Sequence, residues 1–259
     1  MFSWLFKSKE ETTNNPQNKK YEDFSNIETI AKYFESLTGV TFDKQISILN
    51  SKAKSFCQAR DIYSYKELLE RIERDEALKQ ELINRLTTNE TFFYREFSQI
   101  AELVSLIQQE SKKVRILCAP CATGEESYSI AIALLEAGVT QSSFEIVGID
   151  INSDAIKKAQ TALYKERNMR NLSEELRERY FVQEGNTFSV KSHIKTLVEF
   201  KVFNIFEDKF TKLEKFDYIF SRNMLIYFDA QTKLKARSIL ESMLKDRSKK
   251  IFFGHADLF

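Results

Sequence analysis

From residue 114 onward, short apolar runs alternate with helical segments, and this alternation restricts the possible folds more than any other feature of the chain. The runs are "VRILCAP", "FEIVGID", "VEFKVFNI", "FDYIFSRN" and "KKIFFGH", with helical segments such as "EESYSIAIALLEAG" and "SDAIKKAQTAL" between them. Strands that alternate with helices form βαβ units and a mostly parallel sheet. Right-handed crossovers then predict a doubly wound α/β domain over residues 113–259, with its ligand crevice at the carboxyl ends of the strands.

Three other regions depart from this alternation. Residues 21–112 carry helical spacing throughout, as in "IETIAKYFESL", where Gly39 follows as the expected helix end, and they predict a small all-α domain. The stretch "YFVQEGNTFSVKSHIKTLVEF" has two β-like pieces and no helical pattern, so we expect a short antiparallel insertion at about 181–198. Residues 1–20 are an apolar tip, "MFSWLF", and a polar segment that we expect to be disordered. The tip is either a floppy terminus or a contact for a partner or a membrane surface.

Composition excludes few classes of protein. The chain has 259 residues and 42% hydrophobic content, enough for a sizeable core, and its net charge of +1 argues neither for nor against nucleic acid. No apolar run approaches the roughly 20 residues needed to span a bilayer. Three cysteines are too few for a disulfide scaffold. A reducing cytoplasm is therefore the simplest expectation.

The loop after the first strand, "LCAPCATGEES", allows several readings. Its CxxC spacing could belong to a zinc site, but the other candidate ligands, Cys57, His193 and His255, form no second pair. A redox pair should begin a helix, whereas Cys118 ends a strand and the glutamates that follow oppose a thiolate. We therefore expect thiols that pack around a turn, with no metal.

The same loop lacks both glycine-rich phosphate-binding patterns. Glu125 and Glu126 would repel a phosphate and attract a cation, which favours S-adenosylmethionine, a nucleoside with a sulfonium and an ammonium. The alternative is ordinary charge at a helix N-terminus. Asp150 ends the second strand, where an acid can accept hydrogen bonds from both ribose hydroxyls. It could instead cap the next helix, although Asn152 or Ser153 can do that.

Four blocks then resemble the CheR-type chemotaxis receptor methyltransferases: "LTTNETFFYREF", "APCATGEESYSIAIAL", "GIDINSDAIKKAQTALY" and "FDYIFSRNMLIYFD". The closing "FFGHADLF" resembles the family's terminal Gly-His-Ser-Glu block, and the resemblance extends from about Tyr21 to the end. It implies an all-helical N-terminal domain and a Rossmann-like catalytic domain. It also implies methylation of glutamate side chains on the cytoplasmic helical bundle of chemoreceptors, with S-adenosylmethionine as cofactor and S-adenosylhomocysteine as product.

The resemblance also implies the roles of individual residues. The cofactor-binding residues are Asn89, Thr91, Arg95, Ala119, Glu125, Asp150, Asn204, Ile205, Arg222 and Asn223. The catalytic residues are Arg95, whose guanidinium matches the geometry of a carboxylate, and Tyr227, which can donate one hydrogen bond. Taken without the resemblance, Arg95 could be a solvated residue of a helix and Tyr227 a core residue.

Receptor docking is predicted for the stretch "KQISILNSKAKSFCQAR" over residues 44–60, which holds four cations and no acid. Its docking residues would be Lys52, Lys54 and Arg60, unless the stretch is simply a solvated face. The short β insertion favours docking that is independent of a receptor tether.

The chain departs from the family pattern at three points: Asn152 stands for the second acid of Asp-x-Asp, Ala256 and Asp257 stand for Ser-Glu, and the last antiparallel strand is missing from the sequence. We expect a partner or another closure to cover that sheet edge.

The leading hypothesis is therefore a protein-glutamate O-methyltransferase. The alternative is a non-catalytic module that binds S-adenosylmethionine and signals through protein contacts, for which the missing strand argues weakly. A methyltransferase for small molecules or nucleic acid is disfavoured, because "SRNMLIYF" lacks the Pro-Pro loop typical of base methylation and no basic groove is evident.

Overall fold

The computed structural model describes residues 22–246 and 248–257, so the tail predicted for residues 1–20 lies outside the described residues. The central sheet has five strands in the order β6-β2-β1-β7-β8, and every neighbouring pair is parallel. Its strands are β1 (Val114–Cys118), β2 (Phe144–Asp150), β6 (Val198–Val202), β7 (Tyr218–Ser221) and β8 (Lys250–Phe253). This order confirms the predicted doubly wound α/β fold.

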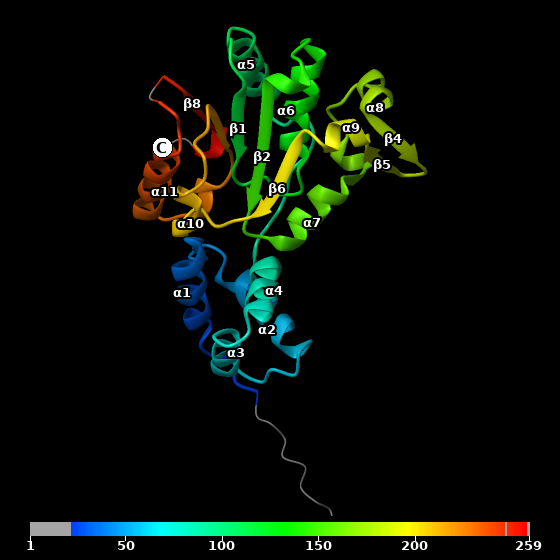
Figure 1. Ribbon diagram of the computed structural model, residues 1–259. Coiled ribbons are helices and arrows are strands. Elements are labelled where there is room, and N and C mark those ends of the chain that lie inside the picture. The colour runs from blue at the N-terminus through cyan, green and yellow to red at the C-terminus, as the bar shows by residue number, and fades with distance from the viewer. Residues whose placement is uncertain (1–21, 247, 258–259) are drawn as a thin grey trace, which may run out of the picture.

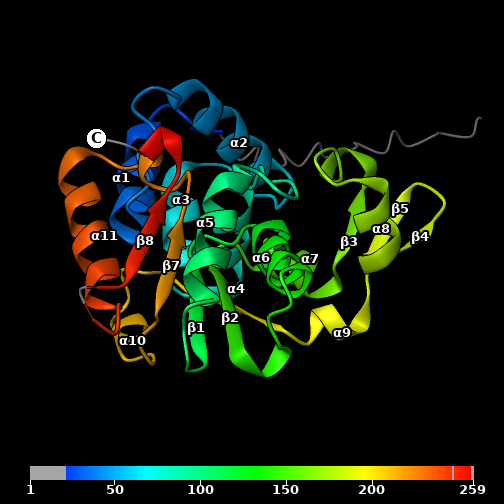
Figure 2. The same cartoon turned by 90° about the horizontal axis from the view of Figure 1, so that it is seen from above.

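Helices cover both faces of the sheet (Figures 1 and 2). One face packs on α5 (Phe97–Ile107), α6 (Glu125–Glu136) and α7 (Ser153–Thr161), and the other on α10 (Asp208–Thr211) and α11 (Ala230–Ser242). Each face of the sheet therefore has its own hydrophobic core, and successive residues of β1 point into opposite cores. Ile116 and Cys118 pack in the core on the α5, α6 and α7 side, and Leu117 packs in the core on the α10 and α11 side. Burial on both faces explains why the central strands β1, β2 and β7 are nearly continuous apolar runs, whereas the edge strands β6 and β8 carry exposed charged residues.

Four helices at the N-terminal side enclose a separate hydrophobic core: α1 (Ile27–Thr38), α2 (Ile46–Gln58), α3 (Tyr65–Ile72) and α4 (Glu76–Leu86). They lie beyond the carboxyl ends of β2 and β6 (Figure 1). Gly39 ends α1 as expected, with a φ of 76° and its N–H donated to the Glu35 carbonyl at 2.7 Å. A side chain at Gly39 would meet Phe206 at 2.7 Å, so this glycine also permits the close approach of the bundle to the sheet domain.

Helix α5 falls in the range predicted for the helical domain, but its buried residues, Ile100, Leu103 and Ile107, pack in the core of the sheet. The boundary near residue 112 stays a prediction. None of the helices in the described ranges has the length and apolar character that crossing a membrane requires.

The predicted antiparallel insertion is present, beside the main sheet (Figure 2). It is a three-stranded sheet of order β3-β5-β4, formed by β3 (Leu163–Lys165), β4 (Phe181–Glu184) and β5 (Thr187–Val190). The expectation that this stretch holds no helix is wrong, because α9 (Ser192–Lys195) makes one turn that buries Ile194. The remaining elements are α8 (Glu174–Tyr180) and the 3₁₀ turns η1 (Gln141–Ser143), η2 (Glu166–Asn168), η3 (Leu225–Tyr227) and η4 (His255–Asp257).

Candidate active site

A cavity of about 940 Å³ lies at the carboxyl ends of β1, β2 and β7, where the helical bundle meets the sheet domain. The bundle contributes side chains such as Phe42, Ile48 and Lys52 to its walls. Nearly all the predicted site residues line it: Asn89, Thr91, Arg95, Ala119, Asp150, Asn204, Ile205, Arg222, Asn223 and Tyr227. Residues far apart in the sequence thus meet at the crevice expected for a doubly wound sheet.

The backbone around this cavity is strained. Four non-glycine residues of the segments that form it adopt left-handed φ values: Tyr94 at 55°, Glu96 at 50°, Ala122 at 48° and Asn223 at 58°. Such conformations persist only where surrounding contacts hold them, and they are frequent at functional sites.

Asp150 ends β2 and is only 5% exposed. Its Oδ1 accepts the Asn152 N–H at 2.8 Å, and its Oδ2 accepts the Ala122 N–H at 2.9 Å. Burial raises the pKa of this carboxyl to about 6, although the backbone N–H groups oppose the shift. Because each carboxylate oxygen can accept two hydrogen bonds, Asp150 retains acceptor capacity toward the cavity that it lines.

The two adjacent glutamates of α6 have different surroundings. Glu125 is fully buried, accepts hydrogen bonds from Thr123 Oγ1 at 2.6 Å and Asn168 Nδ2 at 2.8 Å, and is not among the residues that line the cavity. Glu126 does line it. Successive helical residues point about 100° apart, so both side chains cannot face the same space. The family resemblance assigned cofactor binding to Glu125 of this pair, whereas the structure places Glu126 on the cavity and leaves Glu125 out of its lining.

Glu126 forms one half of a buried ion pair. Its Oε2 accepts a short hydrogen bond from Arg222 Nε, while its Oε1 is buried without a hydrogen-bond partner. The Arg222 side chain is 3% exposed and also donates to the Glu96 carbonyl at 3.3 Å. Burial raises the pKa of Glu126 despite the nearby guanidinium. An orphaned carboxylate oxygen beside a cavity favours a ligand with a hydrogen-bond donor or positive charge.

Arg95 and Tyr227 lie on the same cavity. Arg95 Nη1 donates to the Glu90 carbonyl at 3.0 Å, its guanidinium lies 5.7 Å from the centre of the Phe92 ring, and no carboxylate of the described residues forms an ion pair with it. Burial raises the pKa of Tyr227, with Arg95 acting in the opposite direction. The positive charge of Arg95 is therefore available to an anionic ligand.

Asn204 connects the two domains at the cavity wall. Its Nδ2 donates to the Leu37 carbonyl at 2.7 Å, and its Oδ1 accepts the Phe206 N–H at 3.0 Å. The neighbouring Ile205 is 6% exposed and presents an apolar surface to the cavity. This wall suits a flat, partly apolar group.

The structure separates the predicted docking residues. Lys52 lines the cavity, and its Nζ donates to the Leu86 carbonyl at 3.2 Å. Lys54 lies 5.4 Å from the Phe24 ring, away from the cavity lining. Arg60 pairs with Glu81 at 2.6 Å on a separate groove of the bundle.

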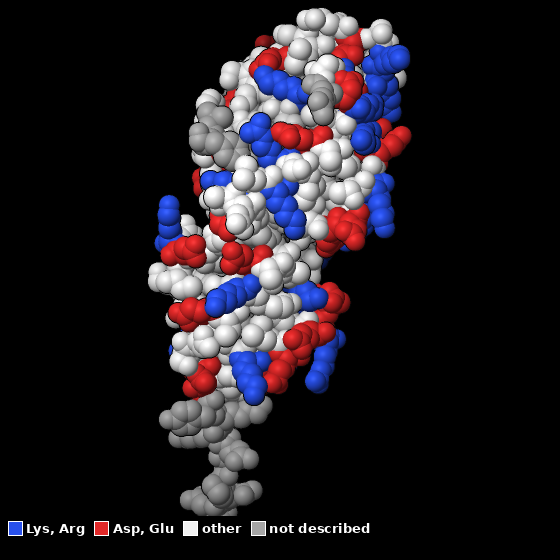
Figure 3. Space-filling model, turned by 90° about the vertical axis from the view of Figure 1, so that its left-hand side faces the viewer, with Lys and Arg blue, Asp and Glu red and all other residues white. Residues whose placement is uncertain are grey.

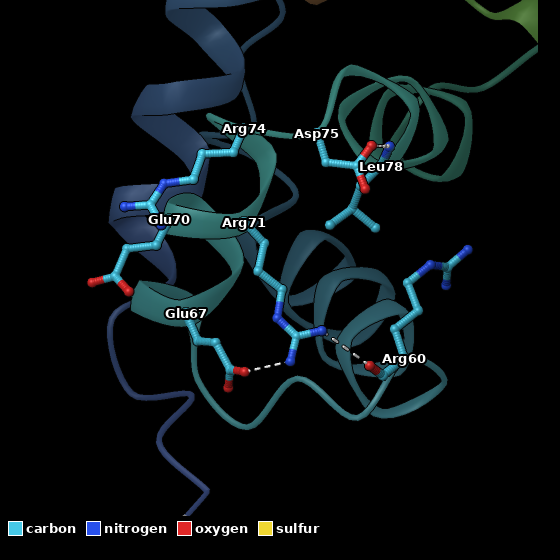
Figure 4. A pocket seen from close by; sticks show the side chains of 7 residues that line it. All are labelled: Arg60, Glu67, Glu70, Arg71, Arg74, Asp75 and Leu78. Carbon is cyan, nitrogen blue, oxygen red and sulfur yellow. Dashed lines mark hydrogen bonds and ion pairs between the residues drawn. The ribbon is translucent and has the colours of Figure 1, made fainter.

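That groove is lined by three arginines, three acids and Leu78 (Figure 4). Arg71 crosses it, pairs with Glu67 at 2.6 Å and donates to the Asp61 carbonyl in the connection between α2 and α3. Its charges balance one another, and the groove has no orphaned buried polar atom among those of the described residues.

The cysteines of the loop pack as the sequence predicts for a turn. Cys118 and Cys121 are buried, and burial raises the pKa of both thiols, which disfavours a reactive thiolate. Cys121 lies against Gly148, where an added side chain would meet Cys121 Cβ at 3.0 Å and Phe200 at 2.7 Å.

Comparison with known proteins gives a consistent result. A family model described as "CheR methyltransferase, SAM binding domain" matches residues 89–259. A chemotaxis protein methyltransferase of Campylobacter jejuni (strain 81-176) is 36% identical over 228 residues, which cover 88% of this chain and 86% of the relative. Proteins of the same name from Borreliella burgdorferi (30% identical, 83% and 81% covered) and Escherichia coli K12 (32%, 70% and 64%) also match.

Proposed function

Because the chain belongs to the CheR family of S-adenosylmethionine-dependent methyltransferases, we propose that it methylates glutamate side chains on the cytoplasmic helical bundle of chemoreceptors, in chemotaxis adaptation. One observation carries this proposal: a single cavity holds two buried carboxylates, Asp150 and Glu126, together with Arg95, which has no acidic partner among the described residues. The carboxylates suit a cationic nucleoside, and the guanidinium suits an anionic acceptor.

The residues of the cavity fit S-adenosylmethionine. Asp150 would accept hydrogen bonds from the ribose hydroxyls, and the orphaned Oε1 of Glu126 would accept one from the α-ammonium group. Asn204 and Ile205 would bracket the adenine, as the family resemblance implies. When bound, this cofactor supplies a methyl group on a positively charged sulfur, which a carboxylate oxygen can attack.

The protein does not need to remove a proton from its substrate, because a glutamate side chain is already ionised at pH 7. Its residues must instead orient the carboxylate and exclude water from it. Arg95 would hold the carboxylate through its planar guanidinium, and Tyr227 would donate one further hydrogen bond. The hydrogen bond from Arg95 to the Glu90 carbonyl orients the guanidinium and leaves its charge without an acidic partner among the described residues, which agrees with such a role.

The test is transfer of a tritiated methyl group to receptor cytoplasmic fragments in single turnovers at saturating cofactor, with base-labile release as the signature of a methyl ester. We expect Arg95→Ala to lose roughly 10²–10³ in rate at an unchanged melting temperature, because an oriented charge in a dry site lowers the barrier by a few kcal/mol. Arg95→Lys should recover only part of the rate, and Tyr227→Phe should lose less than Arg95→Ala.

Wild-type protein that binds S-adenosylmethionine but labels no receptor would instead support a non-catalytic binding module. Labelling of receptors by Arg95→Ala at the wild-type rate would remove Arg95 from the mechanism.

A further inference from the structure

The turn η4 contacts both segments that carry the proposed reactive side chains. We infer that His255 and Asp257 are positioning residues that clamp the loop 222–228 and the segment 95–97 against each other. The contacts that η4 makes are features of the free protein and do not depend on which reaction it catalyses. The expected effect on the rate of methyl transfer rests on the proposed function.

Asp257 is the centre of this clamp. Its side chain is buried, at 1% exposure for the residue, and no lysine, arginine or histidine of the described residues forms an ion pair with it. Backbone N–H groups hold it instead: Oδ2 accepts a short hydrogen bond from Asn223 and one from Gly254 at 3.2 Å, and Oδ1 accepts the Ile226 N–H at 3.2 Å. A buried carboxylate with several N–H donors fixes the backbone that supplies them.

Two of these donors belong to the loop that forms one wall of the cavity. Asn223, Met224, Ile226 and Tyr227 all line the cavity. Asn223 adopts a left-handed φ of 58°, a less populated conformation even for asparagine, and a restraint from outside the loop stabilises it. Asp257 supplies that restraint at both Asn223 and Ile226.

His255 reaches the other segment. Its ring nitrogen Nδ1 lies 2.9 Å from Oε2 of Glu96, the residue that follows Arg95. The backbone N–H of His255 donates to the same oxygen at 3.4 Å. Glu96 is itself in a left-handed conformation, with a φ of 50°. Gln99 adds a third connection, since its Nε2 donates to the Phe253 carbonyl at 2.7 Å.

Close packing makes the clamp specific to this turn. A Cβ atom on Gly254 would lie 2.9 Å from Asp257 Oδ2 and 3.0 Å from the Asn223 nitrogen. No other residue type fits there without moving the carboxylate or the loop. Together with the hydrogen bond from Arg222 to the Glu96 carbonyl, the turn therefore restrains the separation between Arg95 on one segment and Tyr227 on the other.

The experiment is amide hydrogen exchange of the free protein combined with methyl-transfer kinetics, for Asp257→Ala and for Asp257→Asn, which keeps the size of the side chain. We expect faster exchange in peptides covering 222–228. We also expect kcat to fall roughly 10- to 100-fold, as small misplacements of reacting groups do, with receptor KM nearly unchanged. Asp257→Glu should restore part of both properties, because it returns the carboxylate.

The matched control is Asp246→Asn. Asp246 also accepts a backbone N–H, from Ser248 at 2.8 Å, but it is exposed and does not line the cavity. His255→Ala provides a milder second variant that should speed exchange in peptides covering 95–99. Unchanged exchange over 222–228 in both Asp257→Ala and Asp257→Asn would overturn the clamp. Faster exchange with wild-type kcat would overturn its positioning role, while an inactive wild type with the expected exchange pattern would contradict only the proposed function.

Discussion

The buried Asp150 carboxylate lowers the stability of the free protein at neutral pH. Its pKa is about 6 in the folded state, above the ordinary value of 3.8, because burial disfavours the charge. The folded protein therefore holds the proton more tightly than the unfolded chain between these values. The stability that this proton contributes is complete below the unfolded pKa and is lost as the pH rises through about 6.

We predict that the unfolding free energy of the wild type, relative to Asp150→Asn, falls by about 1 kcal/mol from pH 5 to pH 7.5. Other titrating groups are common to both proteins and cancel. Denaturant unfolding at several pH values measures this difference. Curves that stay parallel across the range would show that Asp150 is already ionised at pH 5.

Asp150→Asn should also bind S-adenosylmethionine more weakly at pH 7.5, since ribose hydroxyls need acceptors.

Ten of the eleven cofactor-binding or catalytic residues predicted from the sequence line the cavity, but the sequence did not predict how their side chains are oriented. Asp150 was predictable because it ends an apolar run that had to be a strand. The choice between Glu125 and Glu126 depends on the rotation of α6, and in the structure Thr123 and Asn168 bind the Glu125 carboxylate away from the cavity lining. The sequence marked Asp257 only as a departure from the family's terminal block and gave no role for it, because its partners are backbone N–H groups that no residue pattern specifies.

At the level of helices and strands, the start of α7 joins the sheet domain to the helical bundle. Asn152 caps α7, where its Oδ1 accepts the Ala155 N–H at 2.9 Å. Its Nδ2 donates to Thr87 Oγ1 at 2.7 Å and to the Asn84 carbonyl at 3.2 Å, both at the end of α4. The family's acid at this position could cap the helix but has no hydrogen to donate across the junction.

We therefore predict that Asn152→Asp lowers the free energy of unfolding by about 1–3 kcal/mol, because a buried acceptor would then face the Asn84 carbonyl. The measurement is denaturant unfolding at pH 7. Ser173→Asp is the matched control, since Ser173 caps α8 by accepting the Leu176 N–H and has no such partners in the bundle. That control should change stability by only a few tenths of a kcal/mol. Equal losses in the two variants would mean that the cap, not the junction, matters.

Sequence patterns predicted the long helices and strands but not the short ones. Apolar runs predicted the five parallel strands because β1, β2 and β7 are buried on both sides and the edge strands β6 and β8 still bury apolar residues such as Phe200 and Phe252. Helix α9 escaped prediction because four residues with one buried side chain, Ile194, carry no period. Strand β3, with three residues, is likewise too short to show a period in the sequence. The association of α5 with the sheet could not be predicted either, because an apolar helix face has the same spacing whichever core it enters.

For the molecule as a whole, charge is distributed rather than concentrated. The net charge is +1, and on the face shown in Figure 3 the basic and acidic side chains are interspersed. Long-range attraction of the proposed receptor must then come from local groups. The basic stretch 44–60 remains the proposed source, although only Lys44 and Lys52 of its cations line the cavity.

This arrangement leads to a graded prediction for receptor docking. Lys44→Glu should raise receptor KM by about 2- to 10-fold at low salt, because it reverses a charge at the cavity itself, and Lys54→Glu should have a smaller effect. Lys52 is unsuitable for this test, since its Nζ bonds the Leu86 carbonyl. Lys66→Glu, on the exposed face of α3, is the control for net charge alone. Added salt should abolish the differences, because exposed charges are screened beyond about 10 Å at 0.1 M. Equal effects of Lys44→Glu and Lys66→Glu would mean that the basic stretch is only a solvated face and that the receptor docks elsewhere.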